Sequence, residues 1–210
     1  MNIEQERVKN VYEEIADHFD QTRPFQWPWI TDFIQNSDSN SVLSKKTVLD
    51  IGCGNGRNMM GYRNATVFGI DNCFRFVDIC KKKGLFVNYA NMVNIPFPTD
   101  YFDHLICIAA FHHLASPERR KQALLEMRRI IKPGGTMLLS VWSIRQPEKA
   151  KIKFSKFGDT IVPWNKYGKV YERYYYIFEN QEIYDLFIET GWSIDNHHWD
   201  YGNEIFILKA

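Results

Sequence analysis

The chain has 210 residues, of which 45% are hydrophobic, and a formal net charge of +1. This length suits one domain with a sizeable core, and the balanced charge excludes a polycation that binds nucleic acid over its whole surface. Its four cysteines form no CxxC pair and no zinc spacing, so we expect no metal site and reduced thiols in a cytoplasmic protein, with the nucleus left open as a second compartment. No apolar run reaches the ~18 residues of a transmembrane helix, and no signal peptide is evident, so no membrane contact is expected.

The N-terminal region predicts two helices. Residues 4–20 place apolar side chains at helical spacing with charged residues between them, namely Val8, Val11, Tyr12, Ile15 and Phe19. The segment QTRPFQWPWI interrupts this pattern, and a second helix is expected to about Gln35. The sequence NSDSNSVLSKK then predicts a polar linker. Residues 1–40 are therefore interpreted as a helical extension of a single domain over residues 1–210.

Strands and helices alternate from residue 47 onward. The expected strands are Thr47–Ile51, Thr66–Ile70, Phe86–Tyr89, Asp103–Ala109 and Thr136–Trp142. The expected helices run from the glycine-rich turn through Met60, over Phe74–Lys82, and over Pro117–Ile131, where KPGG ends the last one. Such alternation predicts a parallel sheet with helices on both faces.

A long basic segment interrupts this alternation at residues 143–172. From Ser143 to Tyr171 it carries seven basic and two acidic side chains, and connections of this length are often functional. A helix over Glu179–Thr190 follows, and two strands around the turn DYGN predict an antiparallel hairpin at one edge of the sheet. The predicted fold is an α/β, Rossmann-like, seven-stranded, mostly parallel sheet with a C-terminal antiparallel hairpin.

The stretch VLDIGCGNGRNM joins the first strand to a glycine-rich turn. A dinucleotide site has the spacing GxGxxG, whereas Gly52, Gly54 and Gly56 have the spacing GxGxG. Asp50 would repel a pyrophosphate but suits a cationic amino-acid group. Asp71, fifteen positions after Gly56, ends the second strand, where a carboxylate can accept both hydroxyls of a ribose. The pattern favours a nucleoside with a positive tail, such as S-adenosylmethionine, over glycines that only close a tight turn.

These motifs resemble those of the class I S-adenosylmethionine-dependent methyltransferases. VLDIGCGNGR is similar to their first motif, GID to their second-strand acid, and RIIKPGGTMLL to the approach to their fifth strand. The resemblance implies that the cofactor is held by Asp50, Gly52, Gly54, Gly56, Arg57, Asp71, Asn91 and Met92. Asn91 departs from the family, which usually has Asp there; its side-chain carbonyl can accept from the adenine amino group, and the Met92 backbone can serve adenine N1.

The stretch IAAFHHLAS after the fourth strand excludes some classes of methyltransferase substrate. It lacks the Asn/Asp-Pro-Pro-aromatic tetrapeptide of nucleic-acid amino-methyltransferases. Cys107 lies within a strand without the adjacent proline of pyrimidine C5 enzymes, so we interpret it as a core residue. His112 and His113 are adjacent and point in different directions in a loop. One of them can face the methyl group, or an imidazole can simply bond the loop backbone.

The flanking sequences carry a more specific resemblance. VYEEIADHFDQTRPFQWPWITDFI, FHHLASPERR, VPW and RYYYIF are similar to segments of the eukaryotic tRNA methyltransferases that esterify 5-carboxymethyluridine at the wobble position. The methyltransferase domain fused to an AlkB-type dioxygenase belongs to the same group. The matching N-terminal positions are Tyr12, Ile15, Ala16, His18, Phe19, Thr22, Arg23, Trp27 and Pro28. Tyr176 departs from the family, which has His at that position.

This resemblance implies methyl-ester formation on a carboxylate of tRNA. A carboxylate is ionised at pH 7, so no general base is needed and alignment matters most. Arg23 and Arg173 are candidates for a cationic fork, and His112 joins them as the third candidate catalytic residue. The candidate substrate-binding residues are Thr22, Trp27, His113 and Trp164, with Trp29 a further residue able to stack on a base. Core packing or surface salt bridges are the alternative roles of these side chains.

The resemblance also implies two partners. One is the tRNA anticodon loop, whose phosphates the basic insertion can follow, although a solvated loop is its alternative role. The other is a small zinc-binding activator subunit that forms a heterodimer by covering an apolar surface near a sheet edge. Two other functions stay open, namely a class I enzyme acting on a small molecule and a degenerate, non-enzymatic interaction subunit. The intact set of Asp50, Asp71 and the three glycines argues against the second.

Overall fold

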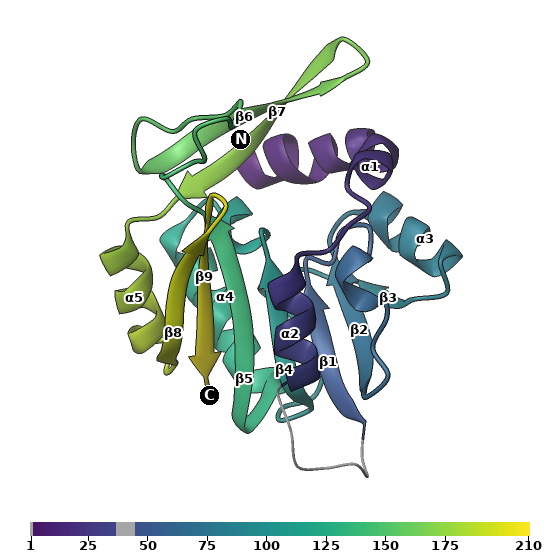
Figure 1. Cartoon of the computed structure of the whole chain (residues 1–210), viewed down its shortest axis with the longest axis vertical. Coiled ribbons are helices and arrows are strands. Elements are labelled where there is room, and N and C mark those ends of the chain that lie inside the picture. Colours follow the sequence, from purple (N-terminus) through teal and green to yellow (C-terminus); the bar gives the residue numbers. More distant parts are fainter. Residues whose placement is uncertain (1, 37–44) are drawn as a thin grey trace.

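The computed structural model describes residues 2–36 and 45–210; most of the expected polar linker lies outside this range. The main sheet has the strand order β3-β2-β1-β4-β5-β9-β8 (Figure 1). Its strands are β1 (Lys46–Ile51), β2 (Ala65–Asp71), β3 (Phe86–Tyr89), β4 (Phe102–Ile108), β5 (Ile131–Trp142), β8 (Ser193–Asp200) and β9 (Asn203–Lys209). The first five are parallel, and β9 is antiparallel to both β5 and β8. The predicted fold class is therefore confirmed.

Helices cover both faces of this sheet. α2 (Pro28–Asn36) and α3 (Phe74–Lys82) pack on one face, while α4 (Pro117–Ile130) and α5 (Asn180–Glu189) pack on the other. The apolar run of β4 shows why: its successive side chains alternate between the two clusters. Residues 105–108 of β4 are all buried, so this part of the strand is a continuous apolar run rather than an alternating one.

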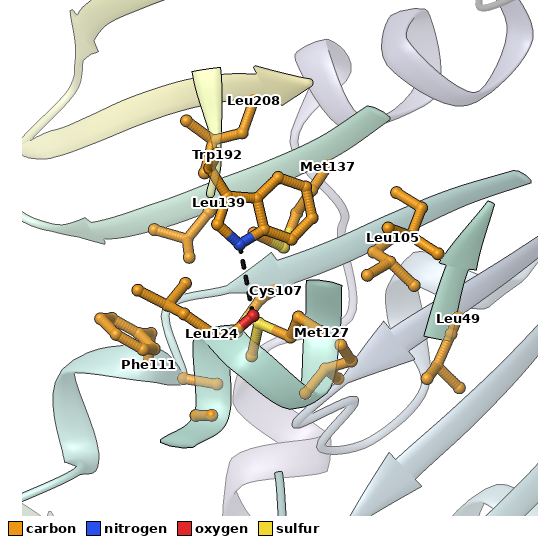
Figure 2. Packing of buried hydrophobic residues seen from close by; sticks show 14 of the residues in the cluster. Leu49, Leu105, Cys107, Phe111, Leu124, Met127, Met137, Leu139, Trp192 and Leu208 are labelled. Atoms are coloured by element: carbon orange, nitrogen blue, oxygen red, sulfur yellow. Dashed lines mark hydrogen bonds between the residues drawn. The ribbon is translucent and has the colours of Figure 1, made fainter. Parts of the chain in front are cut away.

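Trp192 closes the core between α4 and the C-terminal strands. Figure 2 shows its ring among Leu124, Leu139 and Leu208. The indole N–H donates to the carbonyl oxygen of Leu124 at 3.3 Å, so the one polar atom of this buried side chain is satisfied.

The N-terminal helix and the basic insertion lie together above the carboxyl ends of the parallel strands. A π-helical segment, Gln5–Lys9, leads into α1 (Asn10–Thr22). β6 (Gly158–Lys166) and β7 (Lys169–Ile177) form a separate antiparallel hairpin beside α1 (Figure 1). Between the hairpin and α1, the Lys166 ammonium donates to the backbone carbonyl of Glu14 at 2.5 Å. The hairpin and α1 therefore form a roof over the carboxyl ends of the parallel strands, where parallel α/β folds bind their ligands.

Three sequence expectations need correction. The insertion, interpreted as a long basic connection, forms the strands β6 and β7, joined by a two-residue turn in which Tyr167 and Gly168 have φ of 51° and 88°. The helix expected after the glycine turn is only a 3-10 turn, Arg57–Met59. KPGG does not separate helix from strand, because β5 already begins at Ile131 and KPGG forms an irregularity in its pairing with β4.

Two findings concern residues 2–36 and 45–210 as a whole. Within these ranges, no helix is long and apolar enough to cross a membrane. Over the same ranges, His, Cys, Asp and Glu side chains form no group that could hold a metal ion.

Candidate active site

A cavity of about 550 Å³ lies between the roof and the strand ends. Most residues singled out from the sequence line it, namely Thr22, Arg23, Trp27, Gly52, Gly54, Arg57, Asp71, Asn91, Met92, His113, Trp164 and Arg173. Four others, Asp50, Gly56, His112 and Trp29, do not line it. The indole N–H of Trp29 instead donates to the carboxylate of Asp200 at 3.1 Å. The topology thus brings together side chains from α1, the glycine loop, three strand ends and the hairpin.

The three glycines of the loop have different tasks. All three have positive φ, at 74°, 53° and 75° for Gly52, Gly54 and Gly56. A Cβ on Gly52 would lie 2.5 Å from the Cβ of Ala110, whereas a Cβ on Gly54 would meet only Phe19, at 3.9 Å. Gly52 is therefore required by packing, and so is Gly56, whose Cβ would collide with Leu85. Gly54 instead leaves the space beside its Cα open to a ligand in the cavity.

Asp71 anchors this loop and faces the cavity. One of its carboxylate oxygens accepts from the backbone N–H of Gly54 at 2.8 Å, and the other accepts from that of Cys73 at 2.9 Å. Burial raises the pKa of Asp71 to about 6, although these backbone bonds oppose the rise. At neutral pH the carboxylate is ionised and each oxygen keeps a lone pair, which suits the two hydroxyls of a ribose.

Asn91 and Met92 lie at the end of β3. The Asn91 side-chain oxygen accepts from the backbone N–H of Val93 at 3.2 Å. This bond orients the amide beside the cavity and leaves one lone pair on its oxygen.

Asp50 lies behind the glycine loop rather than in the cavity. It is fully buried and shares the face of β1 used by Val48, in the α2/α3 cluster. Neither of its oxygens has a hydrogen-bond partner among the described residues. Burial and then the charge of Asp71 raise the pKa of Asp50 to about 8, with Arg57 opposing. The direct contact predicted between Asp50 and a cationic tail has no geometric support, because the side chain does not line the cavity.

The two histidines differ in position. His113 lines the cavity, whereas His112 is fully buried and accepts from the backbone N–H of Trp142 at 3.1 Å through Nδ1. The catalytic contact predicted for His112 therefore has no geometric support. Burial lowers the pKa of His113 to about 3 and that of His112 well below its usual range. Both imidazoles are neutral at pH 7.

Arg173, on β7, is a buried cation at the cavity wall. Its guanidinium is 3% exposed and takes part in no ion pair among the described residues. Nη1 donates to the hydroxyls of Tyr175 at 2.7 Å and Tyr12 at 3.3 Å. Burial lowers the pKa of Arg173, but these two hydroxyls outweigh it, so the net pKa is raised. Because buried charges are normally paired, this cation suits an anionic ligand.

The remaining candidate side chains divide between the mouth and the wall of the cavity. Arg23 is exposed and lies 5.1 Å from the ring centroid of Trp164. Trp164 is only 7% exposed and packs in the wall, so it is not a free stacking surface. Trp27 lies at the mouth, 6.3 Å from the ring of Tyr201. Thr22 donates its hydroxyl to the carbonyl oxygen of His18 at 2.8 Å, which leaves the oxygen to accept.

The sequence alone indicates no site role for Tyr12 or Tyr175. Tyr12 belongs to a matching motif, and the motif gives no sign that the Tyr12 hydroxyl accepts a hydrogen bond from Arg173. One signal was available for Tyr175: residues two apart on a strand share a face, so Arg173 and Tyr175 project together.

Sequence comparison agrees with this geometry. The Methyltransferase domain family matches residues 49–139. The tRNA (carboxymethyluridine(34)-5-O)-methyltransferase of Schizosaccharomyces pombe is 32% identical, over 97% of this chain and 96% of its own length. This chain belongs to that family. The Arabidopsis thaliana enzyme of the same name is 38% identical over 70% of this chain, which spans only 35% of that relative.

Solved structures share the fold. A [4+2]-cyclase, SpnF, superposes with a TM-score of 0.71 at 14% identity, over 99% of this chain and 95% of its own. A complex between the Haloferax volcanii Trm112 methyltransferase activator and a methyltransferase gives a TM-score of 0.64 at 15% identity, over 97% and 98% of the two chains.

The family's cofactor is S-adenosylmethionine, and the residues at the glycine loop fit it. Gly54 leaves space for a ligand beside its Cα, the ionised Asp71 can accept from the ribose, and Asn91 can accept from an adenine amino group. Arg57 lines the same cavity and can pair with the carboxylate of the amino-acid tail. The chain is therefore an S-adenosylmethionine-dependent methyltransferase.

Proposed function

We propose that this protein transfers a methyl group from S-adenosylmethionine to the carboxylate of 5-carboxymethyluridine at the tRNA wobble position, forming the methyl ester. The observation that carries the proposal is the guanidinium of Arg173, buried at the cavity wall without an acidic partner in the described chain. A cation in this position favours an anionic acceptor over a neutral one.

The chemistry asks for alignment rather than proton transfer. When bound, the cofactor supplies an electrophilic methyl group. The substrate carboxylate is ionised at pH 7, so no residue has to remove a proton from it. Arg173 would hold one carboxylate oxygen and leave the other free, and the roof of α1 and the hairpin would exclude water. The neutral His113 is suited to hydrogen bonding in this wall and not to acid catalysis at pH 7.

The proposed partners follow the features of the surface. The tRNA anticodon loop would enter at the mouth beside Trp27, Arg23 and the exposed lysines of the insertion.

For the activator subunit, the edge strand β3 is a more suitable docking surface than the other edge strand, β8. Phe86 is 67% exposed on β3, and Phe74 and Tyr89 stack with ring centroids 3.8 Å apart. Edge strand β8 instead exposes mostly polar side chains. An unpaired, apolar edge is a surface that a partner strand can cover. The zinc of that subunit and the cytoplasmic location stay predictions.

A methyl-transfer assay tests the proposal. Labelled S-adenosylmethionine is incubated with tRNA that carries 5-carboxymethyluridine or plain uridine at the wobble position, with and without a Trm112-type activator. We expect label only on the modified tRNA, as a base-labile ester, and a loss of at least about 100-fold in Arg173→Ala. Equal labelling of both tRNAs, or full activity in Arg173→Ala, would contradict the proposal.

A further inference from the structure

The hydrogen bonds around Arg173 have defined directions, which begin at His113. Its Nδ1 lies 2.8 Å from the backbone carbonyl of Tyr174. A carbonyl only accepts, so Nδ1 carries the proton of the neutral ring. Nε2 is then an acceptor, and the Tyr12 hydroxyl, 3.0 Å away, must donate to it.

The oxygen of Tyr12 is consequently left to accept. It takes a hydrogen bond from Nη1 of Arg173 at 3.3 Å, and the hydroxyl of Tyr175 lies 3.3 Å from it. Tyr175 itself accepts from Nη1 at 2.7 Å, and it can donate to Tyr12. Both hydrogens of Nη1 therefore point at tyrosine oxygens from two different elements, α1 and β7.

The other edge of the guanidinium is left unused. Nε is buried and has no partner among the described residues, and no hydrogen bond of the described chain involves Nη2. These two nitrogens form one edge of the planar group, whose parallel N–H bonds match the two oxygens of a carboxylate. The faces are also covered, because the guanidinium carbon lies 4.8 Å from the ring centroid of Trp164 and 5.1 Å from that of Tyr175.

We infer that Tyr12 and Tyr175 are positioning residues that occupy Nη1 of Arg173 and so present its Nε/Nη2 edge to the acceptor carboxylate, and that this sets the preference for a carboxylate over a neutral isostere. This inference rests on the proposed function. Without the tyrosine oxygens, Nη1 would be free to bond other acceptors, and the orientation of the guanidinium would no longer be fixed.

The test compares binding of two RNAs by the full chain. Anticodon stem-loops carry either 5-carboxymethyluridine or its neutral amide, 5-carbamoylmethyluridine, at the wobble position, and affinity is measured by fluorescence anisotropy. Charged hydrogen bonds to a carboxylate predict that the wild type prefers the acid by about 10- to 100-fold. We expect Tyr12→Phe and Tyr175→Phe each to reduce that preference to about threefold or less, while affinity for the amide RNA changes little.

Tyr176→Phe is the matched control. It removes the same group from the same strand, but the Tyr176 hydroxyl donates to Glu182 outside the cavity. We expect this variant to keep the wild-type preference. Thermal melting of each variant separates misfolding from misalignment of the Arg173 guanidinium, since a damaged fold would weaken the binding of both RNAs equally.

The outcomes separate the two ideas. If the wild type prefers the acid RNA and both Tyr12→Phe and Tyr175→Phe keep that preference in full, the positioning role is overturned and the proposed function stands. Equal binding of the two RNAs by the wild type would overturn both. Nitrogen-15 spectra of His113 supply an independent check, because we expect Nδ1 to be protonated and Nε2 to be unprotonated at pH 7. The opposite tautomer would overturn the assigned direction of the hydrogen bond from Tyr12 to His113, and with it the positioning role.

Discussion

The guanidinium of Arg173 lies against the indole of Trp164, with 4.8 Å between the guanidinium carbon and the ring centroid. The two residues come from the two strands of the insertion hairpin. The same indole donates its N–H to Nδ1 of His18 at 3.0 Å and stacks on Phe19, both in α1. Trp164 thus connects the hairpin, the N-terminal helix and the buried cation.

We expect Trp164→Phe to slow methyl transfer about 3- to 10-fold, because a phenyl ring attracts a cation less strongly and cannot bond His18. Trp192→Phe is the control, since Trp192 is a buried tryptophan whose N–H also has a single partner, in the core and away from the cavity. It should lower the melting temperature with little change in kcat/KM of the folded enzyme. Equal kinetic losses in the two variants would refute a special role for Trp164.

The central strands β1, β2, β4 and β9 could be predicted because most of their residues are buried and form nearly continuous apolar runs. The hairpin β6–β7 could not, because Pro163 interrupts its pattern and its turn is Tyr-Gly rather than Asn-Gly. Its packing on α1 through Trp164, and on Trp142 and Ile144 through Val162 and Ile177, is a tertiary effect.

The cofactor part of the site followed from the sequence because Gly52, Gly54 and Asp71 belong to one strand–turn–strand unit. The Arg173–Tyr12 contact joins residues 161 positions apart, so no local pattern could reveal it. The choice between His112 and His113 depends on the orientation of a single 3-10 turn, Phe111–His113, which spacing does not specify.

Gly54→Ala should abolish cofactor binding, while its loss of stability is limited to the cost of the positive φ. The added methyl group enters the cavity rather than the core, and its positive φ costs about 1–2 kcal/mol. Gly61→Ala is the matched control, because Gly61 also has a positive φ, of 91°, with nothing within 4 Å and no place in the cavity. Isothermal titration with S-adenosylmethionine measures both. Comparable affinity in the two variants would show that Gly54 does not face the ligand.

The affinity for S-adenosylmethionine should depend on pH through Asp71. Its pKa is raised to about 6 in the free protein, and the ionised form accepts from the ribose. Affinity should therefore rise as pH increases through 6 and level off above 7. Asp71→Asn should bind about 10- to 100-fold more weakly near pH 7.5 and lose this dependence. Titrations at half-unit steps from pH 5 to 8 measure it; a flat wild-type profile would contradict the assignment.

Asp50 should make the ligand-free chain less stable at higher pH. Its folded pKa of about 8 lies above the usual 3.8, so the folded state holds a proton that the unfolded chain has lost. The contribution of Asp50 to stability is full below the usual pKa and is lost as pH rises to about 8, at up to about 1.4 kcal/mol per pH unit. Between pH 6.5 and 8, denaturant unfolding should show this decline in the wild type and not in Asp50→Asn. A parallel decline in both would place its origin elsewhere.

The basic insertion should determine how strongly salt weakens tRNA binding. Lys149, Lys151 and Lys156 are exposed in the segment that precedes β6, and each phosphate contact contributes about 0.7–0.9 to the slope of log K against log salt. Changing all three to Gln should reduce that slope by about 2 and weaken binding most at low salt. The control changes three other exposed lysines, Lys81, Lys82 and Lys121, which lie on α3 and α4 outside the cavity. Because both triple variants remove the same net charge, a local phosphate track predicts a large effect only for the insertion, whereas a general field effect of net charge would lower the two slopes alike.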